Sequence, residues 1–518
     1  MTQVVGGAIH KNSYRDSVEL MGIAAQLEQL PGVSRAGLVM ATPANLAVLA
    51  EAVLSEAATS NPGPNDLVVA IAATDSSSAD AALARAATLL AAGTGSSETT
   101  TQAPAAQTIG EALAELPAAN LALISTPGGY ATAEALKALK HGLNVFLFSD
   151  NVSIDDEIEL KMLAGERGLL VMGPDCGTAI IGGVPLGFAN AVRRGPIGLA
   201  AASGTGLQQV SSLIHRLGSG ASHAIGTGGR DLDEHVGGRT MLAAIGVLMA
   251  DPGTEVVVLI SKPPSPLVAT RILDALRGAT KPVVVNFLGG DPAAVRAVGA
   301  HPAATFEDAA RLATALVRGE TPVATDPGTD PQLDALGRDA AGRLAPGQRE
   351  IRGLFSGGSL AGEAKLILRS VLGPNRHDAI LDLGDDEYTV GRPHPMIDPR
   401  LRNEQIVATA EDPSVAVLLL DVVLGYGSNP DPAGAMAPAI ADAMALAASA
   451  GRHLLVVASV CGTDADPQGL DRQERILAQA GVMLESSNAR AAMLAASIAK
   501  AVDTTLAPAG IAPLAAFK

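Results

Sequence analysis

The chain has 518 residues, of which 48% are hydrophobic but only 2% aromatic, and it contains no tryptophan. With so few aromatic residues, Ala, Val, Leu and Gly must fill the core, which favours helices packed closely on buried parallel strands. The formal net charge is −17, whereas a nucleic-acid-binding surface is basic. The net charge therefore argues against a nucleic-acid partner, and the length is enough for about three or four domains.

The first block, residues 1–92, alternates helical and strand patterns. Apolar residues recur with helical spacing over 17–30 and 79–92, and short apolar runs at 35–41 and 66–73 are bounded by turn residues. We therefore predict a small α+β module. The small and polar segment that follows, 93–107, is typical of a linker.

The middle block, 108–318, repeats strand and helix patterns and predicts two α/β units, 108–192 and 193–318. Helices are expected at 130–142 and 154–168. The predicted strands are 120–126, 144–149, 169–173, 195–203, 255–261 and 281–289.

The last block, 350–518, repeats the same alternation after a second predicted linker, 319–349, that is rich in Pro, Gly and Asp. Its predicted strands are 351–356, 379–384, 415–423, 453–460 and 482–486. The fold class predicted for the chain is therefore α/β, with several doubly wound parallel-sheet domains and the small N-terminal module.

Two segments repeat one pattern: "SGTGLQ" at 203–208 and "SGGSLAG" at 356–362 each follow an apolar run and precede a helical stretch. The first N–H groups of a helix have no internal partner, and glycine lets an anion approach them. The alternative is that glycine only permits tight packing at a strand-to-helix turn. The candidate phosphate-binding residues are Ser203, Gly204, Thr205, Gly206, Ser356, Gly357, Gly358 and Ser359.

The stretch from "MGPDCGTAIIGG" through "IGTGGRD" resembles the α subunit of succinyl-CoA synthetase. The segments "SGGSLAGEA", "ILDLGDDEYTVG" and "AEDPSVAVLLLDVVLGYGS" resemble the C-terminal domain of its β subunit. The fused order, with "KNSYRDSVELM" near the start, is similar to the FdrA family. The resemblance implies a CoA-binding-like Rossmann domain at 108–192, an α-subunit-like domain at 193–318 and a β-subunit-like domain at 350–518. It also implies a phosphate held between the two repeated turns.

The resemblance leaves CoA as the one candidate cofactor, with no cofactor required by the residues themselves. It implies a CoA site at Pro127, Gly128, Gly129, Tyr130, Gly173, Pro174, Asp175 and Cys176. Cys176 and Cys461 are the only cysteines, so reduced and buried thiols are expected instead of a disulfide framework or a nucleophile. The histidines show no metal-ligand spacing, and no structural metal is predicted.

The sequence departs from the synthetase where that enzyme carries its phosphohistidine. The matching loop has His301 as its only histidine, and Gly246 and Lys262 stand where the synthetase has glutamates. A lysine at the carboxyl end of a strand attracts an anion that a carboxylate would repel. Neither a nucleotide-grasp domain nor a Walker motif is evident. These departures suggest that the phosphate arrives already attached to the substrate.

Three functions follow from these observations. The first is a transferase subunit that handles an acyl or carbamoyl phosphate. The FdrA resemblance implies oxamate carbamoyl transfer in purine and allantoin nitrogen catabolism, in which oxamate and carbamoyl phosphate give oxalurate and phosphate. The second is an acyl-CoA synthetase or ligase that uses CoA, and the third is a non-catalytic scaffold subunit. A carboxylate substrate and a homo-oligomer, or a hetero-oligomer with other transferase subunits, are the expected partners.

Lys262 is the first candidate catalytic residue, with a solvated loop lysine as the alternative. Arg230, in a glycine-rich loop at 226–240 that also holds Asp231, His235 and Arg239, suits carboxylate or phosphate binding. In the charged stretch 382–402, Glu387 and His394 are candidate acid and base groups, beside Arg392. Surface or interface loops with paired charges are the alternative for both segments.

The localisation expected from the sequence is the cytoplasm. The first twenty residues carry charges where a secretory signal needs an apolar core. No apolar stretch of transmembrane length lacks polar interruption, so no membrane association is predicted.

Overall fold

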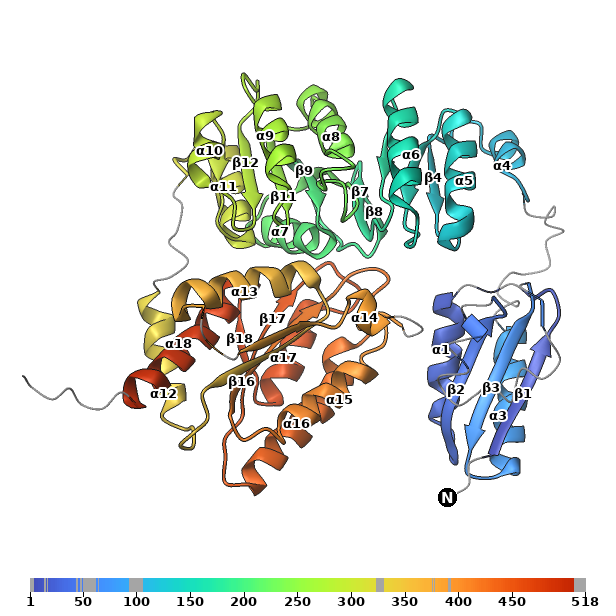
Figure 1. Ribbon diagram of the computed structural model, residues 1–518, viewed down its shortest axis with the longest axis vertical. Helices are drawn as coiled ribbons and strands as arrows, with labels where there is room; N and C mark the ends of the chain where they lie inside the picture. The colour runs from blue at the N-terminus through green and yellow to red at the C-terminus, as the bar shows by residue number, and fades with distance from the viewer. Residues whose placement is uncertain are drawn as a thin grey trace, which may run out of the picture. The chain divides into compact units, whose positions relative to one another are not determined.

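The computed structural model describes residues 4–13, 15, 17–42, 45–46, 49, 62–63, 65–92, 106–322, 330–374, 376, 378–389 and 393–506 (Figure 1). The chain forms two compact units. The N-terminal unit comprises Met1–Ala105 with Asp386–Pro393, and the main unit comprises Ala106–Asp385 with His394–Lys518. Most of the predicted linker 93–107 lies outside the described residues.

The N-terminal unit contains an antiparallel sheet of order β1-β3-β2, formed by Val4–His10, Leu67–Ala73 and Val33–Met40. Alternate residues of the buried central strand β3 face α1 (Ser17–Glu28) and α3 (Ser76–Ala92), which form one core with it. This finding confirms the predicted small α+β module. Strand β1 was not predicted, because "VVGGAIH" places two glycines inside its short apolar run.

The main unit begins with a parallel sheet of order β4-β5-β6, which matches three predicted strands. Helices α5 and α6 pack against each other, and α5 also packs on β4 and β5. The elements in chain order are α4 (Ile109–Glu115), β4 (Leu121–Ile124), α5 (Gly128–Lys140), β5 (Asn144–Leu147), α6 (Ile154–Glu166) and β6 (Val171–Met172).

The second sheet has seven strands in the order β13-β12-β11-β9-β10-β7-β8. Its elements are β7 (Thr178–Ile181), β8 (Val184–Gly187), β9 (Arg194–Ala202), α7 (Gly204–Arg216), β10 (Ala221–Gly226), α8 (Arg239–Ala250), β11 (Val256–Ser261), α9 (Pro266–Ala275), β12 (Val283–Phe287), α10 (Pro292–Ala297), β13 (His301–Pro302) and α11 (Phe306–Val317). The sheet is parallel except at one edge, where β7 pairs antiparallel with both β10 and β8. Gly182 and Gly183, both at positive φ, form the tight turn that reverses the chain there.

The third sheet has five strands, all parallel, in the order β15-β14-β16-β17-β18. Its elements, with α14 of the N-terminal unit between them in sequence, are α12 (Pro331–Ala341), β14 (Glu350–Phe355), α13 (Gly358–Leu372), β15 (Ala379–Asp382), α14 (Asp386–Thr389), α15 (Arg400–Thr409), β16 (Val415–Val423), α16 (Pro432–Ser449), β17 (Leu455–Cys461), α17 (Leu470–Gln479), β18 (Met483–Glu485) and α18 (Asn488–Leu506). The parallel sheets confirm the predicted α/β class.

The predicted linker 319–349 contains helix α12, so the linker prediction is wrong over that stretch. Asp330 caps the helix by accepting from the N–H groups of Gln332 and Leu333, and Pro331 occupies its first turn. Gly337 lies directly against α18 at Ser497. The Pro and Asp that suggested a linker are also the residues that begin a helix. Residues 323–329 lie outside the described residues.

One hydrophobic core joins the second and third sheets. It includes Leu207 of α7, Phe306 of α11, Leu360 of α13 and Ala492 of α18, all of them buried. Helix α13 packs on both α7 and α18, so the strand-to-helix turns of the two sheets are held in one body (Figure 1). Among the described helices, none is both long and apolar enough to cross a membrane.

Candidate functional site

The turn before α7 is capped by its own side chain. Strand β9 ends at Ala202, and the Oγ of Ser203 accepts a hydrogen bond from Gly206 N at 3.1 Å. A Cβ at Gly206 would lie 2.3 Å from that Oγ and 3.0 Å from the ring of Phe306, so only glycine fits. The N–H groups of Gly204 and Thr205 belong to the first turn and have no intrahelical acceptor, which leaves them available to an anion.

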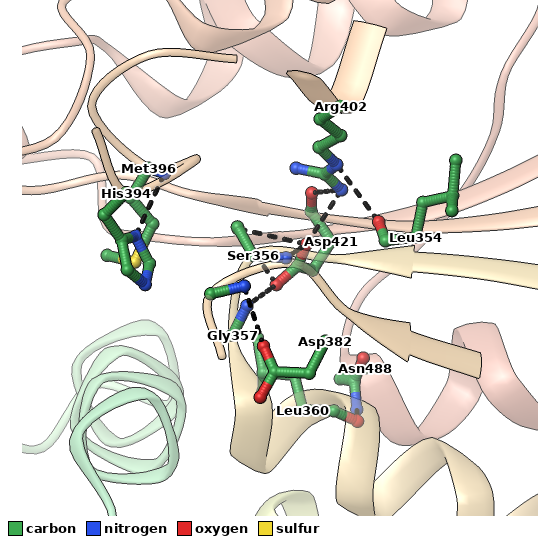
Figure 2. A network of polar contacts seen from close by, with 11 residues as sticks. Leu354, Ser356, Gly357, Leu360, Asp382, His394, Met396, Arg402, Asp421 and Asn488 are labelled. Atoms are coloured by element: carbon green, nitrogen blue, oxygen red, sulfur yellow. Dashed lines mark hydrogen bonds and ion pairs between the residues drawn. The ribbon is translucent and has the colours of Figure 1, made fainter. Parts of the chain in front are cut away.

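The turn before α13 is held by a side chain from another strand. Asp421 of β16 accepts from Ser356 N at 2.9 Å and from Gly357 N at 2.8 Å, and Ser356 Oγ also donates to it (Figure 2). Gly357 is the N-cap and has no side chain with which to cap the helix. The N–H groups of Gly358 and Ser359 begin the helix and have no intrahelical acceptor.

The two turns lie against each other inside the main unit. Ser203 Oγ donates a hydrogen bond to Ser359 Oγ at 2.6 Å, with both side chains buried. A Cβ at Gly357 would lie 3.0 Å from the Oγ1 of Thr205. The positive ends of two helix dipoles therefore meet at one place, which is the arrangement that favours a bound anion.

Lys262 and Asp382 lie at this junction. Lys262 directly follows β11 of the second sheet, and Asp382 is the last residue of β15 of the third sheet. A Cβ at Gly358 would lie 2.1 Å from Asp382 Oδ2 and 3.4 Å from Lys262 Nζ. Lys262 is exposed, and no described carboxylate forms an ion pair with it. Its charge therefore remains available at the N-terminus of α13.

A buried ion pair lies behind the α13 turn. Arg402 of α15 donates to Asp421 Oδ1 at 2.8 Å and, through Nε, to the carbonyl of Leu354 at 3.0 Å (Figure 2). Both side chains are almost fully buried. The guanidinium neutralises the carboxylate, so Asp421 orders the turn without placing an uncompensated negative charge beside the anion site.

His394 lies next to the same turn. A Cβ at Gly384 would lie 2.5 Å from its Nε2, and its ring centroid is 6.2 Å from that of Phe188. Its Nδ1 accepts from Met396 N at 3.2 Å, which assigns the proton of the neutral ring to Nε2 (Figure 2). Burial lowers the pKa of His394 to about 4, although Asp421 opposes the shift. The ring is therefore neutral at pH 7 and presents an N–H donor.

Arg230 is directed to another part of the main unit. It donates to the carbonyl of Val152 at 2.8 Å and pairs with Glu157 of α6 at 3.0 Å. Glu157 and Asp231 each lie 2.8 Å from the buried Nζ of Lys161. The structure thus places Arg230 in a charge cluster that joins α6 to the loop after β10, and not with the two turns.

The two remaining charged candidates of that loop differ in exposure. His235 is exposed and pairs with Asp233 at 2.8 Å, and this hydrogen bond raises the pKa of His235. Arg239 is half-buried and begins α8. A cavity of about 370 Å³ is lined by Arg239 together with Lys161 and Arg271, but by no residue of the two turns.

The predicted charged stretch 382–402 is divided between the two units. Glu387 is exposed in α14 of the N-terminal unit, whereas His394 belongs to the main unit. Arg392 lies outside the described residues. Asp382, Arg402 and Asp421 were not predicted as site residues. A charged residue inside or at the end of a buried apolar strand, as in "AILD" and "LLLD", is the signal that could have found both aspartates.

The predicted CoA-binding residues lie at the start of α5, which follows β4, and in the loop that follows β6. Pro127 is the N-cap of α5, and a Cβ at Gly128 would lie 2.4 Å from the carbonyl oxygen of Asp150 in the loop after β5. Asp175 N donates to the carbonyl of Ser149 at 3.0 Å. Three loops therefore meet at the carboxyl edge of the small parallel sheet. The remaining predicted residues there are Gly129, Tyr130, which is 65% exposed, Gly173 and Pro174.

Neither cysteine is a nucleophile candidate in this structure. Both are buried and free. Burial raises the pKa of Cys176 to about 12, and it raises the pKa of Cys461 further. Burial thus disfavours the thiolate, the reactive form, at both positions.

Comparison with known proteins identifies the family. The chain is 43% identical over 507 residues to the uncharacterized protein YahF of Escherichia coli K12, a match that covers 94% of this chain and 97% of that protein. The chain belongs to the YahF family. The family model described as CoA-ligase matches residues 354–498, which include the α13 turn, Asp382 and Asp421. With the succinate–CoA ligase relatives below, this match relates the present chain to the acyl-CoA synthetase superfamily.

The α-subunit-like part also has relatives. The succinate–CoA ligase [ADP-forming] subunit alpha of Aquifex aeolicus is 29% identical over 168 residues, covering 31% of this chain and 52% of that subunit. The ADP-forming sulfoacetate-CoA ligase subunit SauD of Bilophila wadsworthia is 25% identical over 181 residues, covering 33% of this chain and 60% of that subunit. The chain thus spans little more than half the length of these ligase subunits.

Solved structures overlap the chain in part. ATP citrate lyase of Methanothrix soehngenii, in complex with citrate and coenzyme A, has a TM-score of 0.37 at 19% identity and covers 45% of this chain and 46% of its own. The dinucleotide-forming acetyl-coenzyme A synthetase 1 of Ca. Korarchaeum cryptofilum has a TM-score of 0.29 at 17% identity. The match covers 75% of this chain and 85% of that chain.

The N-terminal unit matches the family model described as "AllF, heavy metal-associated domain" over residues 2–106. That segment contains no cysteine, and His10 is its only histidine. Across the described residues of the whole chain, no three His, Cys, Asp or Glu side chains are placed to hold a metal ion together. The residues present therefore do not fit a heavy-metal site.

Proposed function

We propose that this chain is an acyl-transfer enzyme subunit in which the phosphate of an acyl phosphate binds between the first turns of α7 and α13. The hydrogen bond between Ser203 and Ser359 carries this proposal, because it fixes two helix N-termini at one point. Each N-terminus contributes about half a positive charge and unpaired N–H groups. Two such termini with an exposed lysine beside them make a site for a dianion.

The charges around the junction suit a phosphate. Lys262 adds a positive charge near Gly358, and Arg402 neutralises the nearest fully buried carboxylate, Asp421. When an acyl group leaves an acyl phosphate, the bond between the carbonyl carbon and the phosphate oxygen breaks and negative charge grows on that oxygen. N–H groups and an ammonium fixed before the reaction stabilise this charge, and such preorganised donors lower the barrier.

The donor in this proposal brings its own phosphate. The only histidine of the loop that matches the synthetase phosphohistidine loop is His301 in β13, which pairs with Val284 near the start of β12. Strand β12 ends three residues later, at Phe287. At about 3.3 Å per residue, His301 lies roughly 10 Å short of the carboxyl edge where the two turns lie. This position supports a preformed acyl phosphate over a histidine relay.

The names of the ligase relatives favour CoA as the acceptor. In that case the loops after β4, β5 and β6 are the natural binding surface for it, because the carboxyl edge of a parallel sheet is where such folds bind ligands. The N–H groups at the start of α5 would face the CoA phosphates. Gly128 supports this role, since it keeps the start of α5 close to the Asp150 loop.

Carbamoyl phosphate with oxamate as the acceptor is the second candidate. Lys262 favours it, because a lysine replaces the carboxylate that the synthetase resemblance implies beside a phosphohistidine. An ammonium at this place serves a phosphate that comes with the substrate. Oxamate adds a second anionic group, which the same positive charge would attract.

Isothermal titration tests the proposal. Inorganic phosphate, acetyl phosphate, carbamoyl phosphate and CoA would each be titrated into wild type, Thr205→Glu and Thr205→Val. Thr205 faces Gly357 across the junction, so a glutamate there brings bulk and negative charge, whereas valine keeps the shape. We expect Thr205→Glu to abolish binding of the phosphates and Thr205→Val to keep it within a few-fold.

The pattern of ligands separates the candidates. Binding of acetyl phosphate and CoA favours the acyl-CoA ligase, and binding of carbamoyl phosphate without CoA favours carbamoyl transfer. If wild type binds no phosphate compound, or if Thr205→Glu binds as well as wild type, the proposed function is wrong.

A further inference from the structure

Four ionisable side chains lie around the first turn of α13: Lys262, Asp382, His394 and Asp421. Both oxygens of Asp421 already accept hydrogen bonds, from Ser356, Gly357 and Arg402, so Asp421 is not available as a base. Acyl transfer to an acceptor that carries a proton needs a group that removes the proton as the acceptor attacks. Lys262 is unsuited to this task, because an ammonium has no lone pair and no acceptor capacity. The choice therefore lies between His394 and Asp382.

His394 is also unsuited, because its lone pair is already engaged. Its Nδ1 accepts from the backbone N–H of Met396, so Nε2 of the neutral ring carries the hydrogen. To act as a base, the ring would have to become charged in a half-buried place beside Gly384. The geometry assigns His394 the role of a neutral donor.

Asp382 has one free carboxylate oxygen at the junction. Its Oδ1 accepts from Gly384 N at 3.0 Å, which fixes the plane of the carboxylate (Figure 2). Among the described residues, none donates a hydrogen bond to Oδ2. That oxygen lies over the Cα of Gly358, 2.1 Å from where a Cβ would stand, and therefore beside the first N–H groups of α13.

We propose that Asp382 is the general base of the transfer reaction. This inference rests on the proposed phosphate site. The acceptor, a thiol or an amide N–H written as X–H, attacks the carbonyl carbon of the acyl phosphate, and a C–X bond forms. The bond from that carbon to the phosphate oxygen breaks and its electron pair leaves with the phosphate. The proton of X–H passes to Oδ2 of Asp382 and then to the departing phosphate, which leaves as hydrogen phosphate.

The surroundings of Asp382 suit this role. Burial raises its pKa above the ordinary value for an aspartate, and the charges of Asp421 and Asp385 act in the same direction. The N–H of Gly384 and the ammonium of Lys262 oppose the shift. A carboxylate with a raised pKa is a stronger base than a solvated aspartate, and the ammonium of Lys262 favours its ionised, proton-accepting form.

The test compares Asp382→Asn with wild type in two measurements. The first is calorimetric binding of inorganic phosphate. The second is turnover with acetyl phosphate and CoA, and with carbamoyl phosphate and oxamate, over a range of pH. We expect Asp382→Asn to bind phosphate as tightly as wild type or more tightly, because a negative charge next to the anion is gone. Turnover should fall by about 10²–10⁴-fold, which is the usual contribution of a general base.

The matched control is Asp442→Asn, which removes the same charge from an exposed position on α16. We expect its turnover to stay within about three-fold of wild type. The acid limb of the wild-type pH–rate profile should persist in Asp442→Asn and disappear from the residual activity of Asp382→Asn.

Two outcomes overturn the inference while leaving the phosphate site intact. One is turnover of Asp382→Asn within about ten-fold of wild type with the same acid limb. The other is a wild-type chain that binds phosphate but transfers neither acyl group above the spontaneous rate. Failure of the wild type to bind phosphate has a different meaning, since it removes the proposed function itself.

Discussion

The two Ser-Gly turns look alike in sequence but are built in different ways. The turn before α7 is local, because Ser203 caps the helix three residues away. The turn before α13 depends on Asp421, which accepts hydrogen bonds from Gly357 and Ser356, 64 and 65 residues away in the chain. It also depends on the buried Arg402, which pairs with Asp421. One pattern of residues can therefore produce the same helix N-terminus through a near neighbour or through a distant ion pair. Substitutions should distinguish the locally capped turn before α7 from the turn before α13, which depends on a distant ion pair.

The largest effect is expected at Arg402. Arg402→Ala leaves Asp421 buried without its counter-charge, and breaking one side of such a pair costs about 3–5 kcal/mol. Arg400→Ala is the control, since Arg400 lies on the same helix but is 47% exposed where it pairs with Asp398. It should cost at most about 1 kcal/mol. Urea unfolding followed by circular dichroism measures both, and equal losses would contradict the role given to Arg402.

A smaller effect is expected from glycines of the α7 turn. A Cβ at Gly206 would meet Ser203 Oγ at 2.3 Å, whereas a Cβ at Gly204 would meet only Thr178 Oγ1, at 3.5 Å. Gly206→Ala should therefore lose about 1–3 kcal/mol through overpacking. Gly204→Ala should change stability by no more than about 0.5 kcal/mol. Urea unfolding followed by circular dichroism measures the stability of both variants. If Gly204→Ala lost as much stability as Gly206→Ala, the turn would be packed differently from this description.

Helix α13 should also make stability depend on pH, through its buried residue Glu363. Glu363 of α13 is buried and accepts from Phe306 N at 2.6 Å and from Asn488 Nδ2 at 2.8 Å. Burial raises the pKa of Glu363 from 4.5 to about 7, although both hydrogen bonds oppose this shift. The folded state then holds a proton that the unfolded chain releases. Stability from this group is complete below pH 4.5 and is lost as the pH rises through 7.

Glu363→Gln tests this pH dependence. The free energy of unfolding of the wild type should fall by about 2 kcal/mol between pH 5 and pH 7.5, beyond any change that the variant shows over the same range. Thermal unfolding at the two pH values gives the comparison. Parallel pH profiles for wild type and Glu363→Gln would mean that Glu363 does not titrate in this window.

The smallest expected difference is between the two serines that bond across the junction. Ser203→Ala removes both a helix cap and the hydrogen bond to Ser359, whereas Ser359→Ala removes only that bond. We expect losses of about 1.5 and 1 kcal/mol respectively. A loss for Ser359→Ala that exceeds the loss for Ser203→Ala would reverse the assignment of Ser203 as the local cap.

The sequence predicted well those features that depend on nearby residues. Apolar runs located the parallel strands that end at Ala202 and Phe355, and the following glycines located the two turns. Strand β1 and strand β10, "ASHAIG", were missed because Gly, Ser and His interrupt their apolar pattern. They become strands through pairing with β3 and β9, which a local pattern cannot reveal.

The candidate site was only partly predictable for the same reason. Ser203 and Gly206 carry a local signal, and Lys262 was found from its place at a strand end. Asp421 and Arg402 act on a turn that is about fifty residues or more away in the chain, and only the fold brings them there. Arg230 carried an equally suggestive local signal, yet its partners Glu157 and Val152 hold it elsewhere.

The most direct test of the phosphate site is a crystal structure of the chain with tungstate, a phosphate mimic located by its anomalous signal. The account predicts one anion between the N–H groups of Gly204 and Thr205 on one side and those of Gly358 and Ser359 on the other, within reach of Lys262. An anion bound instead in the cavity lined by Arg239 and Arg271, with none between the turns, would contradict it.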